Sequence, residues 1–277
     1  MIHFADQAQA IEASITENTC VASSTMRIRL TSSEFRQAAC PGQFFMCRNV
    51  DGSDPLIGRA FALYDTGHDW VDLVYAVKGK FTQWLRNRPA GTKLGVWGPL
   101  GNSFACTPVD HLIMVAGGIG QTPFLTLARE ALGKQAYGQG RRCGYASKVT
   151  FCYGAKSSEY FAGLDDFKAT GAEVLLATDD GSVGPARLVT DLLNDVLASS
   201  SNLQRRIVCC GPEPMMQRVG EIAIRNDIDC QVSMETPMAC GLGICFTCVA
   251  KVGTEQEWDY KRTCVEGPIF SAREIVW

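Results

Sequence analysis

The chain has 277 residues, of which 46% are hydrophobic and 20% are charged, and its formal net charge is −3. This length exceeds the roughly 100–200 residues of one domain, so we expect several ordinary globular domains. The absence of a lysine or arginine run argues against a nucleic-acid surface, and the absence of a leader pattern or a long apolar stretch argues against secretion and membrane spanning. We therefore expect a cytoplasmic protein.

The first part of the chain is typical of a small antiparallel barrel. Short runs that alternate apolar and polar residues occur at 26–30, 43–47 and 71–77, and turn-forming pairs such as Pro41-Gly42 separate them. Alternation with period two predicts half-buried strands. We assign residues 1–105 to this β-barrel domain.

From residue 106 the pattern changes to apolar strands that alternate with helical segments. Strands are predicted at 112–116, 149–153, 174–178 and 207–210, each followed by a helix. This βαβ order predicts a parallel-sheet, nucleotide-binding α/β domain over residues 106–227. A glycine-rich, basic segment at 133–147 is expected to be an exposed loop insertion.

A glycine-rich turn follows the first of these strands. Gly117, Gly118 and Gly120 lead into a helix whose first turn is expected to contain Thr122 and Pro123. Backbone N–H groups at such a helix start can approach a pyrophosphate, and the helix dipole favours its charge. The spacing is not G-x-G-x-x-G, so a plain strand-to-helix turn is the alternative interpretation.

Two further loops are expected at the same edge of the sheet. Cys210 ends the last predicted strand, and Gly211 and Pro212 follow it and open a helix. Because ligands of open parallel sheets bind beyond the carboxyl ends of the strands, this loop and the Gly117 turn could face one crevice. Cys210 could then lie near a nicotinamide ring, although a lone cysteine there is more often packing. Residues 179–184 could border the crevice or form a solvent-exposed turn.

Four cysteines near the C-terminus form the most specific pattern in the chain. Cys240, Cys245, Cys248 and Cys264 have the spacing C-x4-C-x2-C-x15-C, which is typical of plant-type [2Fe-2S] ferredoxins. The glycines between them allow the left-handed backbone that wraps a cluster and directs N–H groups at sulfur. A structural zinc site is the alternative, but such sites usually pair two C-x2-C knuckles.

We assign residues 228–277 to this small C-terminal [2Fe-2S] domain, which is too short for a core of its own. We expect the cluster and packing on the sheet domain to stabilise it. The other nine of the 13 cysteines are scattered through predicted strands and helices, and the total is odd. They are interpreted as buried thiols in a reducing compartment rather than as disulfides.

Three fragments of the barrel, beginning at Arg59, Val74 and Gly98, combine an arginine, aromatic rings and glycine turns. These residue types suit a diphosphate and a flat ring, although each fragment alone is equally typical of a barrel. Together with the glycine turn, the Cys-Gly-Pro-Glu-Pro loop and the cysteines, they make the chain resemble the electron-transfer subunits of dihydroorotate dehydrogenase B, in the ferredoxin-reductase superfamily. The resemblance covers nearly the whole chain and is most specific at 238–248, 262–270 and 98–102.

The resemblance implies FAD, a [2Fe-2S] cluster and NAD(H) as cofactors. Carried over by position, the flavin contacts fall on Arg59, Ala60, Phe61, Ala62, Val74, Tyr75, Ala76, Phe81 and Thr82. Two positions depart from the family pattern, because Ala62 stands in place of a serine and Phe81 in place of a glycine. The loss of one neutral hydrogen bond costs about 1 kcal/mol, so we expect weaker flavin binding, with Lys78, Lys80 or Thr82 as substitutes.

The resemblance also implies an electron relay. Hydride would be exchanged between the nicotinamide and FAD, and single electrons would pass through the cluster to a separate FMN-containing catalytic subunit that converts dihydroorotate to orotate in pyrimidine biosynthesis. The implied assembly is a heterotetramer of two plus two chains. No catalytic acid–base pair is predicted, because His3, His68 and His111 have neither mutual spacing nor a neighbouring acid that suggests one.

Three alternatives are left open. The chain could be the small subunit of a related NADH-dependent ferredoxin:NADP oxidoreductase or sulfide dehydrogenase, a free-standing reductase, or an iron–sulfur protein that has lost its flavin. The bound partner, the rate with soluble acceptors and the flavin content would distinguish them. Lys156, Ser157 and Ser158 could meet the 2′-phosphate of NADPH, whereas the resemblance implies NADH.

Overall fold

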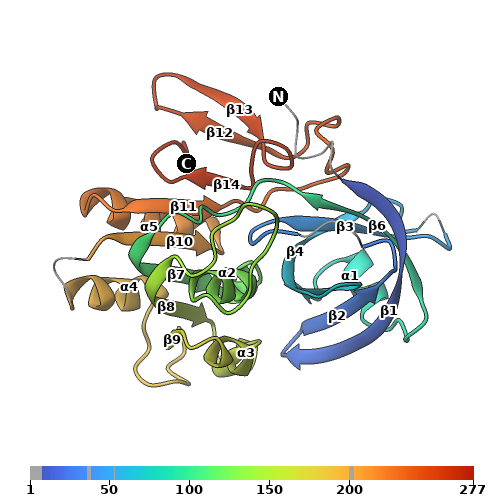
Figure 1. Ribbon diagram of the computed structural model, residues 1–277, viewed down its shortest axis with the longest axis horizontal. Coiled ribbons are helices and arrows are strands. Elements are labelled where there is room, and N and C mark those ends of the chain that lie inside the picture. Colours follow the sequence, from blue (N-terminus) through green and yellow to red (C-terminus); the bar gives the residue numbers. More distant parts are fainter. Residues whose placement is uncertain (1–7, 36–38, 53, 200–202) are drawn as a thin grey trace.

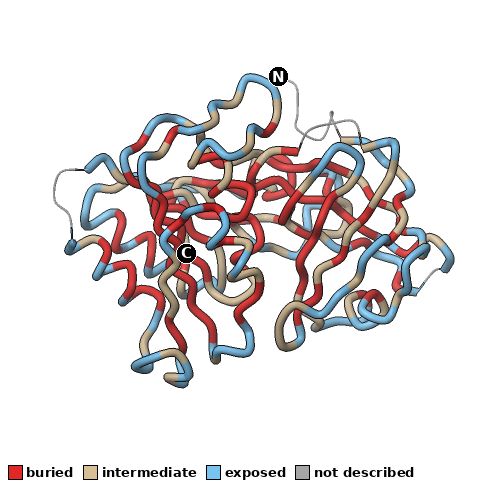
Figure 2. The backbone as a smooth tube through the Cα atoms, turned by 60° about the horizontal axis from the view of Figure 1, so that its bottom comes forward, coloured by how far each residue is buried: buried red, intermediate tan, exposed pale blue. Residues whose placement is uncertain are grey.

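The computed structural model describes residues 8–35, 39–52, 54–199 and 203–277. A closed barrel and a six-stranded sheet lie side by side, and a two-stranded hairpin extends beyond them (Figure 1). Buried residues are concentrated in the middle of both bodies (Figure 2). His3 lies outside the described residues. Within the described ranges, no helix has the length and apolar character needed to cross a membrane.

The barrel consists of six antiparallel strands in the order β1-β2-β5-β4-β3-β6. The runs predicted at 26–30, 43–47 and 71–77 form β2, β3 and β5, because alternate side chains fill the barrel interior. The bounds are β1 Gln9–Ala22, β2 Thr25–Thr31, β3 Phe44–Asn49, β4 Arg59–Thr66, β5 Trp70–Ala76 and β6 Lys93–Leu100, with helix α1 Lys80–Leu85 between β5 and β6.

The second body is a sheet in the order β14-β11-β10-β7-β8-β9, parallel except for β14. Helices α2 and α3 pack on one face together with the barrel, and α4 and α5 pack on the other. The strands are β7 Val109–Gly117, β8 Ala146–Ala155, β9 Glu173–Thr178, β10 Arg205–Cys210, β11 Asp229–Ser233 and β14 Ile269–Ser271. The helices are α2 Phe124–Ala131, α3 Leu164–Ala169, α4 Val189–Ala198 and α5 Glu213–Arg225, with 3-10 turns η2 Gly118–Gln121 and η3 Ser158–Tyr160. The strand order reverses between β7 and β10, where such sheets bind ligands.

Two strands of this sheet come from the last segment of the chain. The expectation that 207–210 is the last sheet strand was wrong, because β11 extends the parallel sheet and β14 pairs with it in the opposite direction. β11 is only five residues long, and Asp229 and Gln231 alternate with its buried residues. So short and polar a strand lacks the apolar run that marked its neighbours. The predicted domain boundaries stay a prediction.

The cysteine segment packs mainly on the barrel. Trp97 of β6 donates its indole N–H to the carbonyl oxygen of Cys240 (2.8 Å). One apolar cluster joins the outer face of the barrel to this segment: Phe44, Met46, Leu100, Cys248, Cys264 and Val265. The expected packing on the sheet domain is therefore right for β11, β14 and the residues around Ile275, but not for the cysteine loop. The packing of the cysteine segment on the barrel is reflected in β3, which buries side chains on both of its faces: five of its six residues are buried. The hairpin of β12 Val249–Gly253 and β13 Trp258–Arg262 follows the cysteine loop.

The segment at 133–147 is a loop, but it is not a free insertion. Tyr137 and Tyr145 are buried, and Arg141 forms a two-pronged ion pair with the buried carboxylate of Glu130 on α2. The Arg141 guanidinium also donates to Ser103 Oγ, at 2.7 Å. The prediction of an exposed insertion was therefore wrong in part, because two aromatic rings and one arginine fix the loop between α2 and the end of the barrel.

Candidate functional site

The cysteine loop has the left-handed backbone that a cluster-binding turn needs. Gly241 and Gly243 have φ of +72° and +78°, and Phe246 between the cysteines has φ of +56°. The Leu242 N–H donates to the sulfur of Cys240 (3.3 Å). Glycine adopts this conformation without steric cost, so the predicted left-handed turns are present, with one N–H directed at sulfur, and the wrap around a cluster stays a prediction.

The four thiols come together as two pairs. Sγ of Cys248 lies 3.1 Å from Sγ of Cys264, and a hydrogen bond from Cys240 is among the causes that lower the pKa of Cys245. Among the residues that the structure describes, no three His, Cys, Asp or Glu side chains converge as one metal ion would require. Two thiolates for each of two irons is the ligation of a four-cysteine [2Fe-2S] cluster, so the donor set fits this group better than a tetrahedral zinc ion.

The two pairs differ in electrostatics. Hydrogen bonds with the Thr247 hydroxyl and amide, followed by Cys240, lower the pKa of the exposed Cys245 thiol to about 6. Burial, followed by the hydrogen bond with Cys248, raises the pKa of Cys264 to about 12. Iron binding requires thiolates, so Cys245 is prepared for ligation and Cys264 must lose a proton when the cluster forms.

The glycine turn after β7 meets the loop after β10. A Cβ at Gly117 would lie 2.7 Å from Cδ of Pro212, and a Cβ at Gly120 would overlap the carbonyl oxygen of Cys210. Gly118 has φ of +54°, and no atom lies within 4 Å of the position of its missing Cβ. The structure therefore brings the two predicted loops into contact and leaves the backbone at Gly118 approachable.

The helix after this turn starts later than predicted. Residues Gly118–Gln121 form the 3-10 turn η2, and Pro123 caps helix α2, which begins at Phe124. Thr122 lies between them, and its N–H donates to the carbonyl oxygen of Ile119 (3.2 Å). A tighter 3-10 turn at a helix start is common, and only the exact start of the helix was predicted wrongly.

The loop after β10 opens helix α5 as predicted, with Pro212 at the cap. Burial, followed by the charge of Glu235, raises the pKa of the Cys210 thiol to about 12. This thiol therefore stays protonated near neutral pH, and Gly211 packs against Gly117. The observed role of the loop is close packing against η2, and the suggested nicotinamide contact of Cys210 stays a prediction.

The predicted flavin strand β4 lies between the other two parts of the site. On its outer face, Ala60 belongs to the apolar cluster that contains Cys248 and Cys264. Further along the strand, Tyr64 belongs to the cluster shared with the α/β domain, where Val74 of β5 and Ile119 of η2 also meet. Ala62 is half-buried between these two positions. This outer face therefore extends from the cysteine loop to the cluster that contains Ile119 of the glycine turn.

Three of the predicted flavin residues point into the barrel instead. Phe61, Tyr75 and Phe81 are 8%, 2% and 1% exposed, and the Phe61 ring lies 5.5 Å from Tyr75 and 6.1 Å from Phe81. Any flavin contact from these residues would therefore have to come from the backbone. Arg59 is exposed, and it donates to the carbonyl oxygens of Ile57 and Gly58 (3.0 Å each). Its remaining donors suit a diphosphate, which fits FAD.

Two of the three residues expected to compensate at the flavin site already have partners for their side chains. The Thr82 hydroxyl accepts hydrogen bonds from the N–H groups of Lys78 and Gly79 (3.0 and 3.1 Å), and Lys80 forms an ion pair with Asp54. The Lys78 side chain is exposed. Phe81 is a core residue that packs on Trp84, so its departure from glycine is absorbed inside the barrel.

The loops after β8 and β9 are joined at the same edge of the sheet. The N–H of Ser158 donates to Oγ of Ser182 (2.7 Å), and the N–H of Asp180 donates to the carbonyl oxygen of Lys156 (3.2 Å). Ser157 is half-buried between them. The sequence placed these loops separately, and parallel pairing of β8 with β9 makes them one surface.

Two residues of the site were missed in the sequence. Trp97 binds the backbone of Cys240, and Thr247 lowers the pKa of Cys245. Thr247 lies between two predicted ligands, so its position in the sequence could have indicated that it belongs to the site. Nothing in the sequence indicates a role for Trp97, because its contact is 143 residues away along the chain. The remaining histidines lie elsewhere, with His111 bound to Thr150 inside the sheet and His68 exposed after β4.

Family comparisons agree with this geometry. Residues 235–276 match the iron–sulfur cluster binding domain of dihydroorotate dehydrogenase B, and residues 114–221 match the oxidoreductase NAD-binding domain. Among solved structures, the chain is similar to an NADH-dependent reduced ferredoxin-NADP oxidoreductase, with a TM-score of 0.80, 25% identity and coverage of 96% of this chain and 90% of that one. It also shares the fold of phthalate dioxygenase reductase, with a TM-score of 0.61, 15% identity and coverage of 88% and 87%.

Curated relatives cover almost the whole chain. The dihydroorotate dehydrogenase B (NAD(+)) electron transfer subunit of Geobacillus thermodenitrificans is 32% identical over 95% of this chain and 96% of its own length. The Fusobacterium nucleatum subunit of the same name is 29% identical over 95% and 97%. The predicted cofactor set of FAD, [2Fe-2S] and NAD(H) is confirmed at the level of the family. The chain therefore belongs to the family of electron-transfer subunits of dihydroorotate dehydrogenase B and is an oxidoreductase subunit for NAD-linked electron transfer.

Proposed function

We propose that this chain passes electrons between NAD(H) and a separate FMN-containing subunit that oxidises dihydroorotate to orotate. The main support is the position of β4, whose outer face carries Ala60 at the cysteine cluster and Tyr64 at the α/β domain. A flavin on this strand would lie between the nucleotide crevice and the cysteine loop. The proposed assembly is two of each subunit, working in the cytoplasm, where the 13 free cysteines would stay reduced.

Different residues of the chain have different roles in this proposed relay. When bound, the flavin and the iron–sulfur cluster supply the conversion between hydride and single electrons. The backbone of η2 holds the dinucleotide pyrophosphate, and the packing of Gly117 against Pro212 fixes the crevice. Trp97 and the apolar cluster around Leu100 hold the cysteine loop rigidly on the barrel. Rigid placement is the contribution that a protein makes to a cofactor relay.

The cysteine loop offers a surface for the partner subunit. Ile244 and Phe246 are 76% and 62% exposed, and Leu242 is also exposed. These apolar side chains are interleaved with the cluster ligands, and the Arg262 guanidinium lies 5.1 Å from the Phe246 ring centre. Exposed aromatic and aliphatic side chains beside an arginine are typical of the centre of a protein interface. We therefore propose that the partner covers this loop.

A second candidate has its own support. The structural similarity to an NADH-dependent reduced ferredoxin-NADP oxidoreductase extends over 96% of this chain. The same relay could therefore serve another flavoprotein partner. The partner, rather than the cofactors, separates this candidate from the first.

The deciding experiment is anaerobic affinity purification from the native cell, followed by an assay for dihydroorotate-dependent reduction of NAD. We expect a stoichiometric FMN protein and that activity. Copurification of another oxidoreductase without the activity would favour the second candidate. A chain that purifies alone and reduces soluble acceptors rapidly would favour a free-standing reductase.

A pair of variants tests the docking surface. We expect Phe246→Asp to weaken the complex at least about tenfold, since a charge in an interface core is strongly unfavourable, while the cluster absorbance is retained. Leu56→Asp is the matched control, because Leu56 is equally exposed (66%) but lies on a barrel loop. Equal affinity of both variants for the partner would exclude this surface.

A further inference from the structure

Arg262 lies at the base of the hairpin, next to the cluster ligands. It is the last residue of β13, and at this end of the hairpin Cys248 precedes β12 while Cys264 follows β13. Its side chain is 26% exposed and turns back onto the cysteine loop, where one guanidinium N–H donates to the carbonyl oxygen of Gly243 (3.0 Å). Arg262 therefore joins the segment of the last ligand to the loop that carries the first two.

Gly243 is bound on both sides. Its carbonyl oxygen accepts from Arg262. Burial is the largest cause that raises the pKa of the Cys264 thiol to about 12, and a hydrogen bond from the Gly243 backbone opposes it. A Cβ at this glycine would lie 3.1 Å from Cγ1 of Val265 and 3.4 Å from Nη1 of Arg262. The glycine that directs its backbone at a ligand sulfur is therefore held in place by the arginine.

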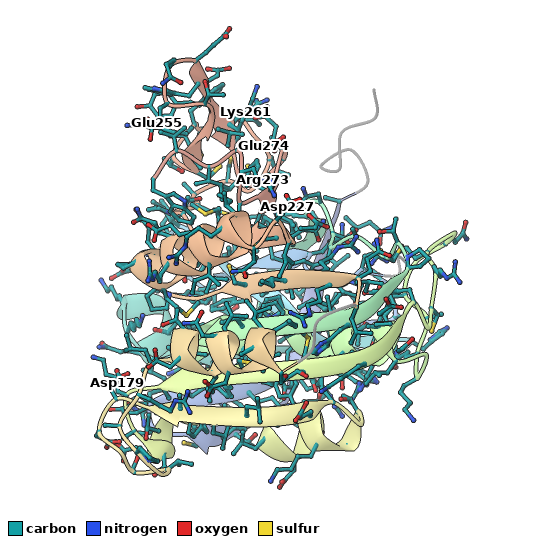
Figure 3. The ribbon with its side chains drawn as sticks, turned by 90° about the vertical axis from the view of Figure 1, so that its left-hand side faces the viewer. Asp179, Asp227, Glu255, Lys261, Arg273 and Glu274 are labelled. Atoms are coloured by element: carbon teal, nitrogen blue, oxygen red, sulfur yellow. The ribbon has the colours of Figure 1, made fainter. Side chains whose placement is uncertain are left out.

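One carboxylate faces both cations of this segment. Arg262 donates its backbone N–H and its Nε–H to one oxygen of Glu266 (2.8 and 3.3 Å). Lys261, labelled on the hairpin in Figure 3, approaches the other oxygen (3.7 Å) and has a second partner in the exposed Asp259 (3.5 Å). Loss of the Arg262 charge and loss of the Glu266 charge therefore change the electrostatic potential at the cysteine loop in opposite directions.

We propose that Arg262 is a positioning residue that raises the reduction potential of the cluster, and that Glu266 limits this rise. The electron supplied by the flavin converts one ferric ion to ferrous without taking up a proton, so the cluster gains one negative charge. A fixed cation and a backbone N–H directed at sulfur both stabilise this added charge. The inference rests on the cluster of the proposed function and is independent of which partner receives the electron.

The contact with Phe246 strengthens the effect of the charge. The guanidinium lies 5.1 Å from the centre of this ring, and about three quarters of the Arg262 side chain is shielded from water. A charge that is partly removed from water acts more strongly on its surroundings than one that is fully solvated. The planar fork of an arginine can bind Gly243 and Glu266 at once, and a lysine ammonium lacks this geometry.

The test is a reduction titration of the purified, cluster-loaded protein, followed by the electron paramagnetic resonance signal of the reduced cluster. Arg262→Gln loses the charge but keeps an N–H donor, and we expect it to lower the equilibrium constant for reduction at least about tenfold, or about 59 mV for one electron. Glu266→Gln keeps an acceptor for Arg262 and should raise that constant at least about threefold. Arg262→Lys should deviate less from the natural protein than Arg262→Gln.

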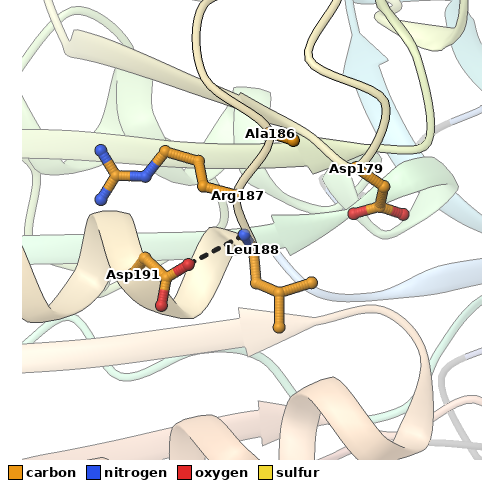
Figure 4. A pocket seen from close by; sticks show the side chains of 5 residues that line it. All are labelled: Asp179, Ala186, Arg187, Leu188 and Asp191. Carbon is orange, nitrogen blue, oxygen red and sulfur yellow. Dashed lines mark hydrogen bonds between the residues drawn. The ribbon is translucent and has the colours of Figure 1, made fainter.

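Arg187→Gln is the matched control. Arg187 also forms an ion pair, with Asp195 (2.6 Å), and its side chain is 30% exposed, close to the value for Arg262. It lines a cavity before α4 (Figure 4). Figure 3 shows Asp179, which lines the same cavity, far from Lys261, the neighbour of Arg262. The same loss of charge at this distance should leave the reduction potential unchanged.

The signs of the shifts separate this inference from a purely structural role of the ion pair. Structural damage would shift the potential of both charge variants in the same direction or leave it unchanged, and either result would overturn the inference while the relay stays intact. If Arg262→Gln assembles no cluster, the sign of the shift in Glu266→Gln decides. Absence of a [2Fe-2S] signal in the natural protein would overturn the cluster part of the proposed function itself.

A second measurement tests the placement of Gly243. Hydrogen–deuterium exchange over residues 241–245 should be at least about threefold faster in Arg262→Gln than in the natural protein, because the loop loses its charge-assisted hydrogen bond. Exchange in Arg187→Gln should match that of the natural protein. Equal exchange in all three proteins would exclude a positioning role of the arginine.

Discussion

The barrel meets its two neighbours through contacts that differ in charge. Toward the α/β domain, ion pairs supplement the shared apolar cluster around Tyr64: Arg27, which binds the fully buried carboxylate of Asp72 within the barrel, reaches Asp166 of α3 (3.2 Å). Toward the cysteine segment the contact is apolar and is built around Met46 and Leu100, which are both 0% exposed. An apolar contact depends on shape, whereas a buried ionic contact depends on the presence of every partner.

The difference suits the two tasks of the barrel. The cysteine loop needs one fixed position relative to β4, and close apolar packing provides it. The α/β domain adds directional bonds, because Tyr64 donates to Asp166 (2.7 Å) and Arg129 of α2 donates to Asp65 (2.6 Å). Directional bonds define the angle between two bodies, and the loss of one partner leaves a charge without compensation.

The largest effect is expected from removing Asp72, the buried carboxylate within the barrel that holds Arg27 where it reaches the α/β domain. Asp72→Asn leaves Arg27 and Arg29 without their shared carboxylate, and we expect a loss of about 4 kcal/mol in the free energy of unfolding, measured with urea. The control is Asp54→Asn, which removes an exposed ion pair with Lys80 and should have little effect. Equal effects of the two variants would contradict the distinction between buried and exposed pairs.

A cavity in the apolar contact between the barrel and the cysteine segment should cause the next largest loss in the free energy of unfolding. Leu100→Ala is expected to cost about 3 kcal/mol through lost burial and the void that remains. It should also accelerate cluster loss to a chelator, followed by the visible absorbance, because Leu100 contacts the cluster segment. Leu56→Ala, at an exposed position, is the control. Unchanged cluster loss in Leu100→Ala would show that this packing does not hold the loop.

The two contacts can be compared only near neutral pH, because acid lowers the free energy of unfolding through a buried histidine of the sheet. Burial, followed by the charges of Lys148 and Arg205, lowers the pKa of His111 from 6.5 to about 4. The folded state therefore disfavours protonation, so this part of the stability is present above pH 6.5 and is lost as the pH falls toward 4. We expect a loss of about 2 kcal/mol near roughly pH 5, measured by urea unfolding.

The matched variant for this effect is His111→Gln, which cannot become charged in this range but can still bind Thr150. Its stability should change less between neutral pH and roughly pH 5 than that of the natural chain. A parallel decline in both proteins would assign the acid sensitivity to other groups.

The smallest effect is expected from losing the indole hydrogen bond that supplements the apolar contact between the barrel and the cysteine segment. Trp97→Phe removes the hydrogen bond to Cys240, and we expect a cost of about 1 kcal/mol with the cluster still bound. Thermal unfolding and the visible spectrum measure the two quantities. A complete loss of the cluster would mean that this single bond, rather than the packing, positions the loop.

Several features were predictable because their residues are close in sequence. Cys240, Cys245 and Cys248 lie within nine positions, and the glycines between them have the expected positive φ. The parallel strands were visible as apolar runs of a few residues each. The burial of the thiols outside the site was predicted less well. Four of them are buried, namely Cys47, Cys152, Cys209 and Cys230, but Cys20 is exposed.

The flavin strand marks the limit of position-by-position inference. Resemblance selected Phe61 and Phe81 as contacts, yet both side chains fill the barrel interior. Strand alternation turns Ala60 and Ala62 outward, and closure of the barrel decides which face is outside. The same limit applies to the loop at 133–147, whose composition suggested exposure although Arg141 pairs with a buried glutamate.

The sequence alone determined the spacing of the cluster ligands, the glycine turn and the alternation of strands and helices, because each depends on residues within one local segment. The tertiary structure alone decided that Trp97 meets Cys240, that Arg27 meets Asp72 and that β11 joins the sheet. Such contacts join residues 23 to 143 positions apart. Their formation depends on how whole surfaces pack, and no local pattern of residue types encodes that packing.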